Sequence, residues 1–225
     1  LTKAALAEGK DKYFVSVTDL GGVGDIMASL RGNEELCIDL FECPDAVKRA
    51  NQKITKIWRE VFEKLADMIR TNSEGCPSRL LWAPGKHYPL QCDFSALISP
   101  GMFEEFFLPE IQDSCRYLEF PMYHLDGKDA AKNHLDTLLN ISELRAIQWV
   151  PGDGAPPLKT WLPMLRHIQE AGKSVYIGAS PSELKDVFDQ LLPEKLYIST
   201  RASSPEEADD IIKMVEKLSF VKKVY

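Results

Sequence analysis

The chain has 225 residues, of which 44% are hydrophobic, and it carries a formal net charge of −7 at pH 7. These values predict a globular protein with a single domain over 1–225, and the acidic balance without a basic stripe argues against nucleic acid or an anionic membrane as a partner. The sequence has no run of about 20 apolar residues and no leader before a cleavage site, so we expect a cytoplasmic protein.

The chain opens with the end of a helix that stops at Gly9 and leads into a strand over 13–18, so we expect further structure upstream. Runs of β-branched or aromatic residues predict further strands over 79–83, 121–125, 145–150, 173–179 and 195–200. Apolar residues at helical spacing predict helices over 45–72, 101–118, 157–171, 181–192 and 205–218. This alternation predicts a parallel sheet covered by helices. Because a complete (β/α)₈ barrel needs about 250 residues, the pattern suggests a barrel that lacks its N-terminal strands.

Three helix starts are marked by capping residues. The sequences SPSE at 180–183 and SPEE at 204–207 each provide a serine cap, a proline at the first helical position and a glutamate three residues after the serine. At the third start Ser99 and Pro100 predict a cap, but Met102 replaces the glutamate of the reciprocal pair.

His124 and Asp126 end the strand predicted over 121–125. Side chains alternate across a strand, so these two share a face and lie at its carboxyl end, where parallel α/β proteins build their active sites. An imidazole and a carboxylate there can share a proton, bind a metal or hold a polar substrate. The alternative is structural: His124 caps a loop and Asp126 caps the helix from Lys128.

Two further aspartates precede polar turns. Asp93 follows Cys92 and leads into an apolar helix, and we predict that it is a metal ligand or proton acceptor; otherwise it organises its loop. Asp19 follows the first predicted strand and either faces the same cavity or begins a turn. The glycines after it, at 21, 22 and 24, lack the spacing and the Lys-Ser/Thr of a nucleotide-binding loop.

Three residues near later strand ends are candidates for substrate binding. Gln148 and Trp149 precede a Pro-Gly-Asp-Gly loop, and the indole either forms the floor of a flat substrate site or belongs to the core. Arg201 follows the last predicted strand and either binds a carboxylate or phosphate or forms a surface ion pair. The remaining histidines (His87, His134 and His167) have no partner at metal-ligand spacing, so we expect them to be structural.

Four segments, in this order and spacing, resemble the uroporphyrinogen decarboxylase superfamily, which includes cobamide-dependent methyltransferases: TDLGGVGDIMASLRGNEELCIDLFECPDAVKR, CDFSALISPGMFEEFFLP, YHLDG and IQWVPGDG. The most specific part is an aspartate loop leading into Ser-Pro-x-x-Phe-x-x-Phe, followed by a strand that ends in His-x-x-Gly. The resemblance covers nearly the whole chain. It implies a (β/α)₈ TIM barrel, here its C-terminal portion, with a pocket at the carboxyl ends of the strands.

Family methyltransferases that use coenzyme M hold zinc with His-x-Cys and a later cysteine. Here His124 matches the histidine, but Asp126 stands at the cysteine position and no cysteine follows Cys115. The five cysteines form neither CxxC pairs nor a disulfide framework. Any zinc site would therefore use nitrogen and oxygen ligands from His124, Asp126 and either Asp93 or Cys92.

The resemblance implies one of two activities. The first, which we favour, is methyl transfer from a small methylated donor to a corrinoid on a partner protein, with zinc or an acid at His124 and Asp126. The second is decarboxylation of a porphyrinogen in tetrapyrrole biosynthesis, which needs no cofactor but needs many cations for its acidic substrate. A third hypothesis is a barrel that only binds a small molecule. We expect the chain to be inactive alone and to form a homodimer that covers its open sheet edges.

Overall fold

The computed structural model describes residues 1–79 and 81–222. It divides into two compact units. The first contains Leu1–Leu125 and Asp129–Arg145, and the second contains Asp126–Lys128 and the chain from Ala146 onward. None of the helices in the described ranges is long and apolar enough to cross a membrane.

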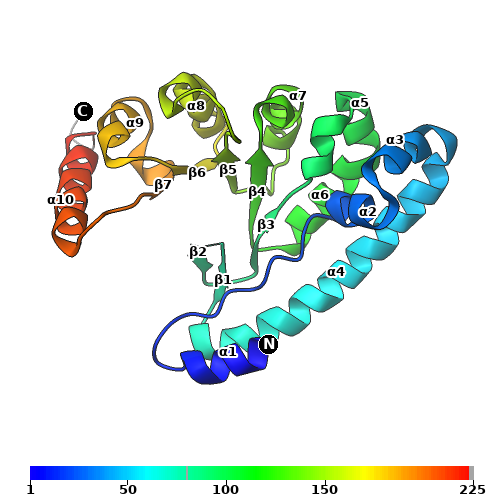
Figure 1. The fold of residues 1–225 in the computed structure, drawn as a ribbon, viewed down its shortest axis with the longest axis horizontal. Helices are drawn as coiled ribbons and strands as arrows, with labels where there is room; N and C mark the ends of the chain where they lie inside the picture. Colours follow the sequence, from blue (N-terminus) through cyan, green and yellow to red (C-terminus); the bar gives the residue numbers. More distant parts are fainter. Residues whose placement is uncertain (80, 223–225) are drawn as a thin grey trace. The chain divides into compact units, whose positions relative to one another are not determined.

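The first unit begins with four helices (Figure 1): α1 (Thr2–Gly9), α2 (Val23–Arg31), α3 (Asn33–Glu42) and α4 (Pro44–Ser73). The end of α1 at Gly9 confirms the predicted stop. α4 has a proline in its first turn and ends at Ser73, and the capping residue after it, Glu74, has a left-handed φ of 52°. Its buried face includes Trp58 and Phe62, whose stacked rings lie 5.3 Å apart.

The strand predicted over 13–18 is wrong, because residues 13–22 form neither helix nor strand. Tyr13 and Phe14 are 58% and 65% exposed, so this run buries too little apolar surface to join a sheet. Of the run only Val17 is buried, and its N–H donates a 2.9 Å hydrogen bond to the carbonyl of Pro77.

Two short strands, β1 (Cys76–Ser78) and β2 (Leu81–Ala83), pair antiparallel. In their register Cys76 faces Ala83 and Ser78 faces Leu81. The strand predicted over 79–83 is therefore present from Leu81, but it belongs to a hairpin instead of the parallel sheet. Arg79, at the turn of this hairpin, has a left-handed φ of 43°.

The parallel sheet has five strands in the order β3-β4-β5-β6-β7: β3 (His87–Leu90), β4 (Phe120–Asp126), β5 (Ala146–Val150), β6 (Ser174–Gly178) and β7 (Leu196–Ser199). Four of them confirm the strands predicted from residue 121 onward. The predicted TIM barrel is wrong: in the described ranges the parallel sheet is open, with β3 and β7 as its edges, and the hairpin forms a separate sheet. The described residues do not form eight βα units.

The helix predicted over 101–118 is present but interrupted. It consists of α5 (Pro100–Met102), the π-helix η2 (Phe103–Phe107) and α6 (Leu108–Tyr117). Pro109 cannot donate a backbone hydrogen bond to the preceding turn, and the carbonyl of Phe106 accepts a separate hydrogen bond from Asn51 Nδ2 at 2.9 Å. Ser99 Oγ accepts from the Met102 N–H at 3.3 Å, which confirms the predicted cap. The unit also contains the short helix η1 (Asp93–Leu97) and most of α7 (Lys128–Leu139).

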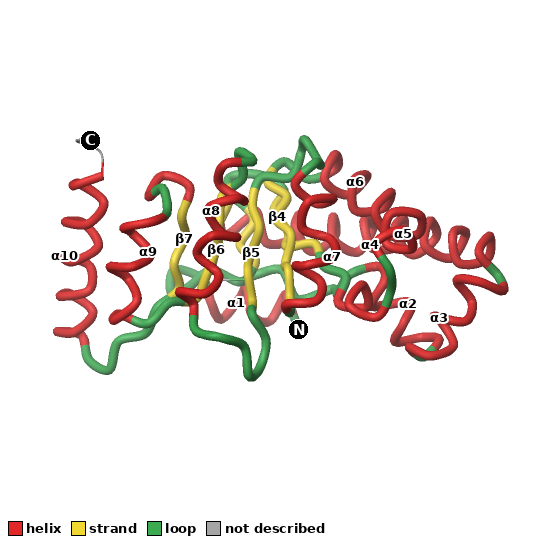
Figure 2. Tube along the Cα trace, turned by 90° about the horizontal axis from the view of Figure 1, so that it is seen from above, coloured by secondary structure: helices red, strands yellow, loops and turns green. Residues whose placement is uncertain are grey.

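In the second unit β5, β6 and β7 lie side by side (Figure 2). Its helices are η3 (Leu158–Trp161), α8 (Leu162–Glu170), η4 (Pro181–Glu183), α9 (Leu184–Gln190), η5 (Pro193–Lys195) and α10 (Pro205–Lys222). The capping box predicted at Ser180 is confirmed, with Glu183 as its partner. At the start of α10 Ser204 Oγ accepts from the Glu207 N–H, but the Glu207 carboxylate accepts from the Ser203 N–H at 2.6 Å, so only half of that predicted box forms.

Candidate functional site

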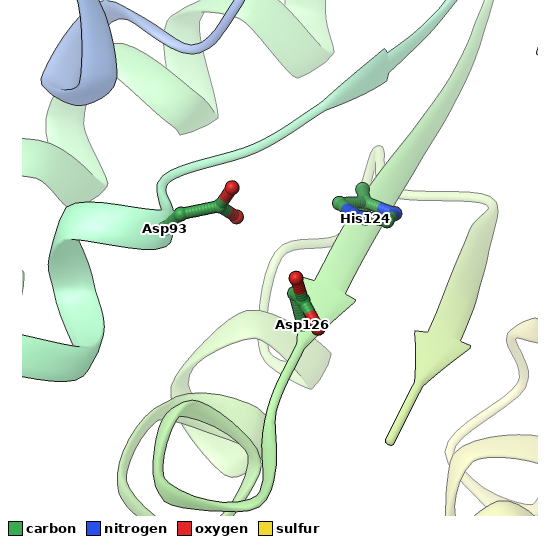
Figure 3. A group of neighbouring side chains, drawn as sticks. All are labelled: Asp93, His124 and Asp126. Carbon is green, nitrogen blue, oxygen red and sulfur yellow. The ribbon is translucent and has the colours of Figure 1, made fainter. Parts of the chain in front are cut away.

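Asp93, His124 and Asp126 form one group (Figure 3), in which each residue offers a ligand atom within 4.8 Å of the others. Asp93 begins η1, and the other two project from the same face of β4 near its carboxyl end, as the alternation of a strand requires. The imidazole of His124 is buried, Asp126 is half-buried and Asp93 is exposed. The structure therefore brings together the three residues that the sequence predicted as catalytic.

This donor set suits a divalent transition metal. One imidazole nitrogen and two carboxylate oxygens are ligands for zinc, iron or manganese, and the two negative charges balance the ion. Donors around a tetrahedral ion lie about 3.4 Å apart when each bond is about 2.1 Å long. The separations here are up to 4.8 Å, so small side-chain rotations close the set around an ion. Three protein ligands leave a coordination position for substrate.

The structural alternative for Asp126 is not supported. Its carboxylate accepts no hydrogen bond from any described residue, so it does not cap α7. Gly127 separates it from the helix, with a left-handed φ of 79°, and the Gly127 N–H donates to the Val150 carbonyl at 2.9 Å. A carboxylate left open on a strand face beside a buried imidazole is suited to a ligand role.

Asp19 begins a turn, and it also interacts electrostatically with His124. Its Oδ1 accepts hydrogen bonds from the Gly21 N–H at 2.9 Å and the Tyr88 hydroxyl at 3.1 Å, and its Oδ2 accepts from Arg79 at 2.7 Å. Burial alone would raise the pKa of Asp19, but the Gly21 N–H, Arg79, Tyr88 and His124 together hold it below its ordinary value. Asp19 is therefore an ionised carboxylate.

The residues that connect Asp19 to the Asp93 loop were not predicted from the sequence. Arg79 Nη2 also donates to Gln91 Oε1 at 2.8 Å, and Gln91 Nε2 lies 3.5 Å from Asp25 Oδ2. Asp25 Oδ1 in turn accepts from the N–H of Phe94, the residue after Asp93, at 2.9 Å. These partners are 12 to 69 residues apart in sequence, so no local pattern predicts them.

The glycines near Asp19 allow close packing. A Cβ on Gly22 would lie 1.8 Å from the carbonyl oxygen of Gln91, and one on Gly24 would lie 2.6 Å from Cys92 Sγ. Both distances are far below van der Waals contact, so only glycine lets the start of α2 approach the segment after β3. These contacts account for the glycine run without a phosphate ligand.

A hollow of about 590 Å³ lies beside Asp93. Its walls come from α2, η1 and the turn between α2 and α3, and they include Asp25, Ser29, Asn33 and Leu97. Its size falls in the range of small-molecule sites. The hollow thus places a volume for a small substrate directly against one ligand of the group.

The other predicted substrate residues lie in the second unit, and none of them belongs to the Asp93 group. Trp149 is only 2% exposed and its ring lies 4.9 Å from that of Trp161, so it is a core residue. Gln148 is half-buried on β5. Arg201 is exposed after β7 and forms no ion pair with a described residue.

Two other histidines are structural, as predicted. The His87 Nδ1 lies 2.7 Å from the carbonyl oxygen of Phe120, and the His134 Nε2 lies 2.9 Å from that of Ser95. Burial lowers the pKa of both rings. The contact with Ser95 holds η1, the helix that begins at Asp93.

No protein-family model matches this chain, and no curated protein is detectably similar to it. The resemblance to the uroporphyrinogen decarboxylase superfamily therefore rests on the sequence motifs.

Proposed function

We propose that this protein is an enzyme that transfers a methyl group from a small methylated donor to a corrinoid carried by a partner protein, at the site formed by Asp93, His124 and Asp126. The observation that carries the proposal is this group of three ligands beside a hollow of about 590 Å³. Methyl transfer, rather than another metal-assisted reaction, is supported by the family motifs. A bound divalent ion such as zinc would act as a Lewis acid that polarises the heteroatom of the donor.

The protein groups have distinct tasks in this proposal. His124 provides an imidazole nitrogen from a rigid strand, and Asp126 provides a carboxylate from the same face two residues later. Asp93 provides the third ligand from η1, and Asp25 fixes that segment through the Phe94 N–H. Arg79 and Tyr88 hold the Asp19 carboxylate in one orientation close to His124.

The charges favour a small donor over a porphyrinogen. Asp19, Asp93 and Asp126 surround His124, whereas the cation described there, Arg79, is already engaged by Asp19. A porphyrinogen carries several carboxylates and would be repelled by this excess of acids. Decarboxylation is therefore the less favoured activity and serves as an outcome of the test.

The test is turnover by the full-length protein with zinc, using methanol, trimethylamine and dimethyl sulfide as donors and cob(I)alamin as acceptor. We expect methylation of cobalamin by one donor and loss of that activity in His124→Ala. The exposed histidine variant His167→Ala is the matched control and should retain activity. Absence of turnover with every donor, or full activity of His124→Ala, would refute the proposal, and cofactor-free loss of CO₂ from uroporphyrinogen would replace it with decarboxylation.

A further inference from the structure

A second cavity lies in the first unit, in the groove between α4 and the segment formed by η2 and α6. It has a volume of about 700 Å³, within the range of small-molecule sites, and it includes none of Asp93, His124 and Asp126. The proposed methyl transfer assigns it no task.

The inner wall of the groove is polar and fixed. Asn51, Thr55 and Arg59 follow one another at a spacing of four residues, so they share one face of α4. Asn51 donates to the Phe106 carbonyl at 2.9 Å, and Thr55 Oγ1 donates to the Asn51 carbonyl at 2.8 Å. Both side chains are therefore hydrogen-bonded within the protein.

Glu110 differs from these residues because it lines the groove, is only 8% exposed, and forms no hydrogen bond or ion pair with any described residue. Burial, opposed by the charge of Arg59 and aided by the charges of Asp25 and Asp113, raises its pKa to about 8. At pH 7 the carboxyl is mostly protonated. The carboxyl therefore lines the groove without a hydrogen-bond partner from the protein, and a ligand group can pair with it.

Three of the four cations that line the groove pair with other acids, and the fourth, Lys56, is exposed. Arg59 pairs with Asp113 at 2.6 Å and lies over the ring of Tyr117, and Lys48 pairs with Glu105 at 2.6 Å. Arg116 also lies 3.5 Å from Asp113. None of these ion pairs includes Glu110, so its carboxyl has no ion-pair partner among the described residues. Phe106 and Pro109 provide the apolar part of the lining.

We propose that this groove binds a small primary amine, whose ammonium group pairs with Glu110 and whose hydrocarbon part lies against Phe106 and Pro109. The amine enters as the ammonium ion, and the Glu110 carboxyl releases its proton to solvent as the ion pair forms. Arg59 from α4, Asp113 from α6 and Asp25 from α2 are the charged groups that face this carboxyl.

The test is calorimetric titration of the whole chain with n-butylammonium chloride at pH 7, in two buffers that differ in ionisation enthalpy. We expect saturable binding with release of nearly one proton, because the free carboxyl is mostly protonated at this pH. Neither n-butanol nor butyrate should bind. Absence of butylammonium binding, or binding without proton release, would overturn the proposal, and this result needs no variant.

A pair of variants locates the site. Glu110→Gln keeps the shape of the neutral carboxyl and should weaken butylammonium binding by more than about tenfold, because it removes one partner of a buried charge pair. Glu105→Gln changes a half-exposed acid at the same groove and should leave binding and proton release unchanged. Equal binding by wild type and Glu110→Gln would place the amine elsewhere and refute the assignment.

Discussion

The buried carboxyl of Glu110 should make the stability of the protein fall as the pH rises. Its pKa is raised from an ordinary 4.5 to about 8, so between these values the folded state keeps a proton that the unfolded state has released. The free energy of unfolding therefore decreases with increasing pH by about 1.4 kcal/mol per pH unit in this window, to an upper limit of about 5 kcal/mol. Below pH 4.5 both states are protonated and the penalty is absent.

Glu110→Gln removes this titration while it keeps the size and neutrality of the side chain. We expect the variant and wild type to have similar free energies of unfolding near pH 4.5. The difference between them should then grow in favour of the variant by about 3 kcal/mol as the pH rises from 5 to 7.5. Urea unfolding followed by tryptophan fluorescence at several pH values measures this difference, and subtracting the two proteins cancels all other titrating groups. A difference that stays constant with pH would refute the reasoning, and Glu105→Gln, at a half-exposed acid, should give such a constant difference.

Two further changes test the packing of the site and of the groove. Gly22→Ala should prevent normal folding or strongly lower the melting temperature, because its Cβ would lie 1.8 Å from the Gln91 carbonyl oxygen. In the control variant Gly101→Ala the added Cβ meets nothing within 4 Å, so this change should be neutral or slightly stabilising. Equal melting temperatures of the two variants would contradict the close approach at Gly22. Asn51→Ala leaves the Phe106 carbonyl without its donor and should cost about 1–3 kcal/mol in urea unfolding, and a loss below about 0.5 kcal/mol would show that this bond does not hold the π-helix.

Local sequence patterns predicted the later βα units well. The strands from residue 121 onward and the caps at Ser99 and Ser180 depend on neighbours in the sequence, and the structure has them. β3 was missed because it is four residues long and contains Pro89, a residue that strands tolerate at an edge. The strand predicted over 13–18 has the right residue types, but its aromatic side chains are more than half exposed and belong to no sheet.

Part of the candidate site was predictable because it, too, depends on residues that are close in the sequence. Strand alternation placed His124 and Asp126 on one face, and the loop position of Asp93 suggested that it joins them. Arg79 and Asp25 were not predictable because their roles depend on hydrogen bonds to partners 60 or more residues away. The barrel was expected from the family motifs and the strand count, and neither determines whether a sheet closes.

Metal binding by the Asp93 group tests the central claim most directly. The protein is saturated with zinc, freed of unbound metal by gel filtration, and its zinc content measured for wild type, for His124→Ala and Asp126→Asn, and for the control His167→Ala. We predict about one zinc per chain in wild type and in the control, and loss of that zinc in both site variants. Absence of zinc from wild type, or equal zinc in all four proteins, would contradict the account.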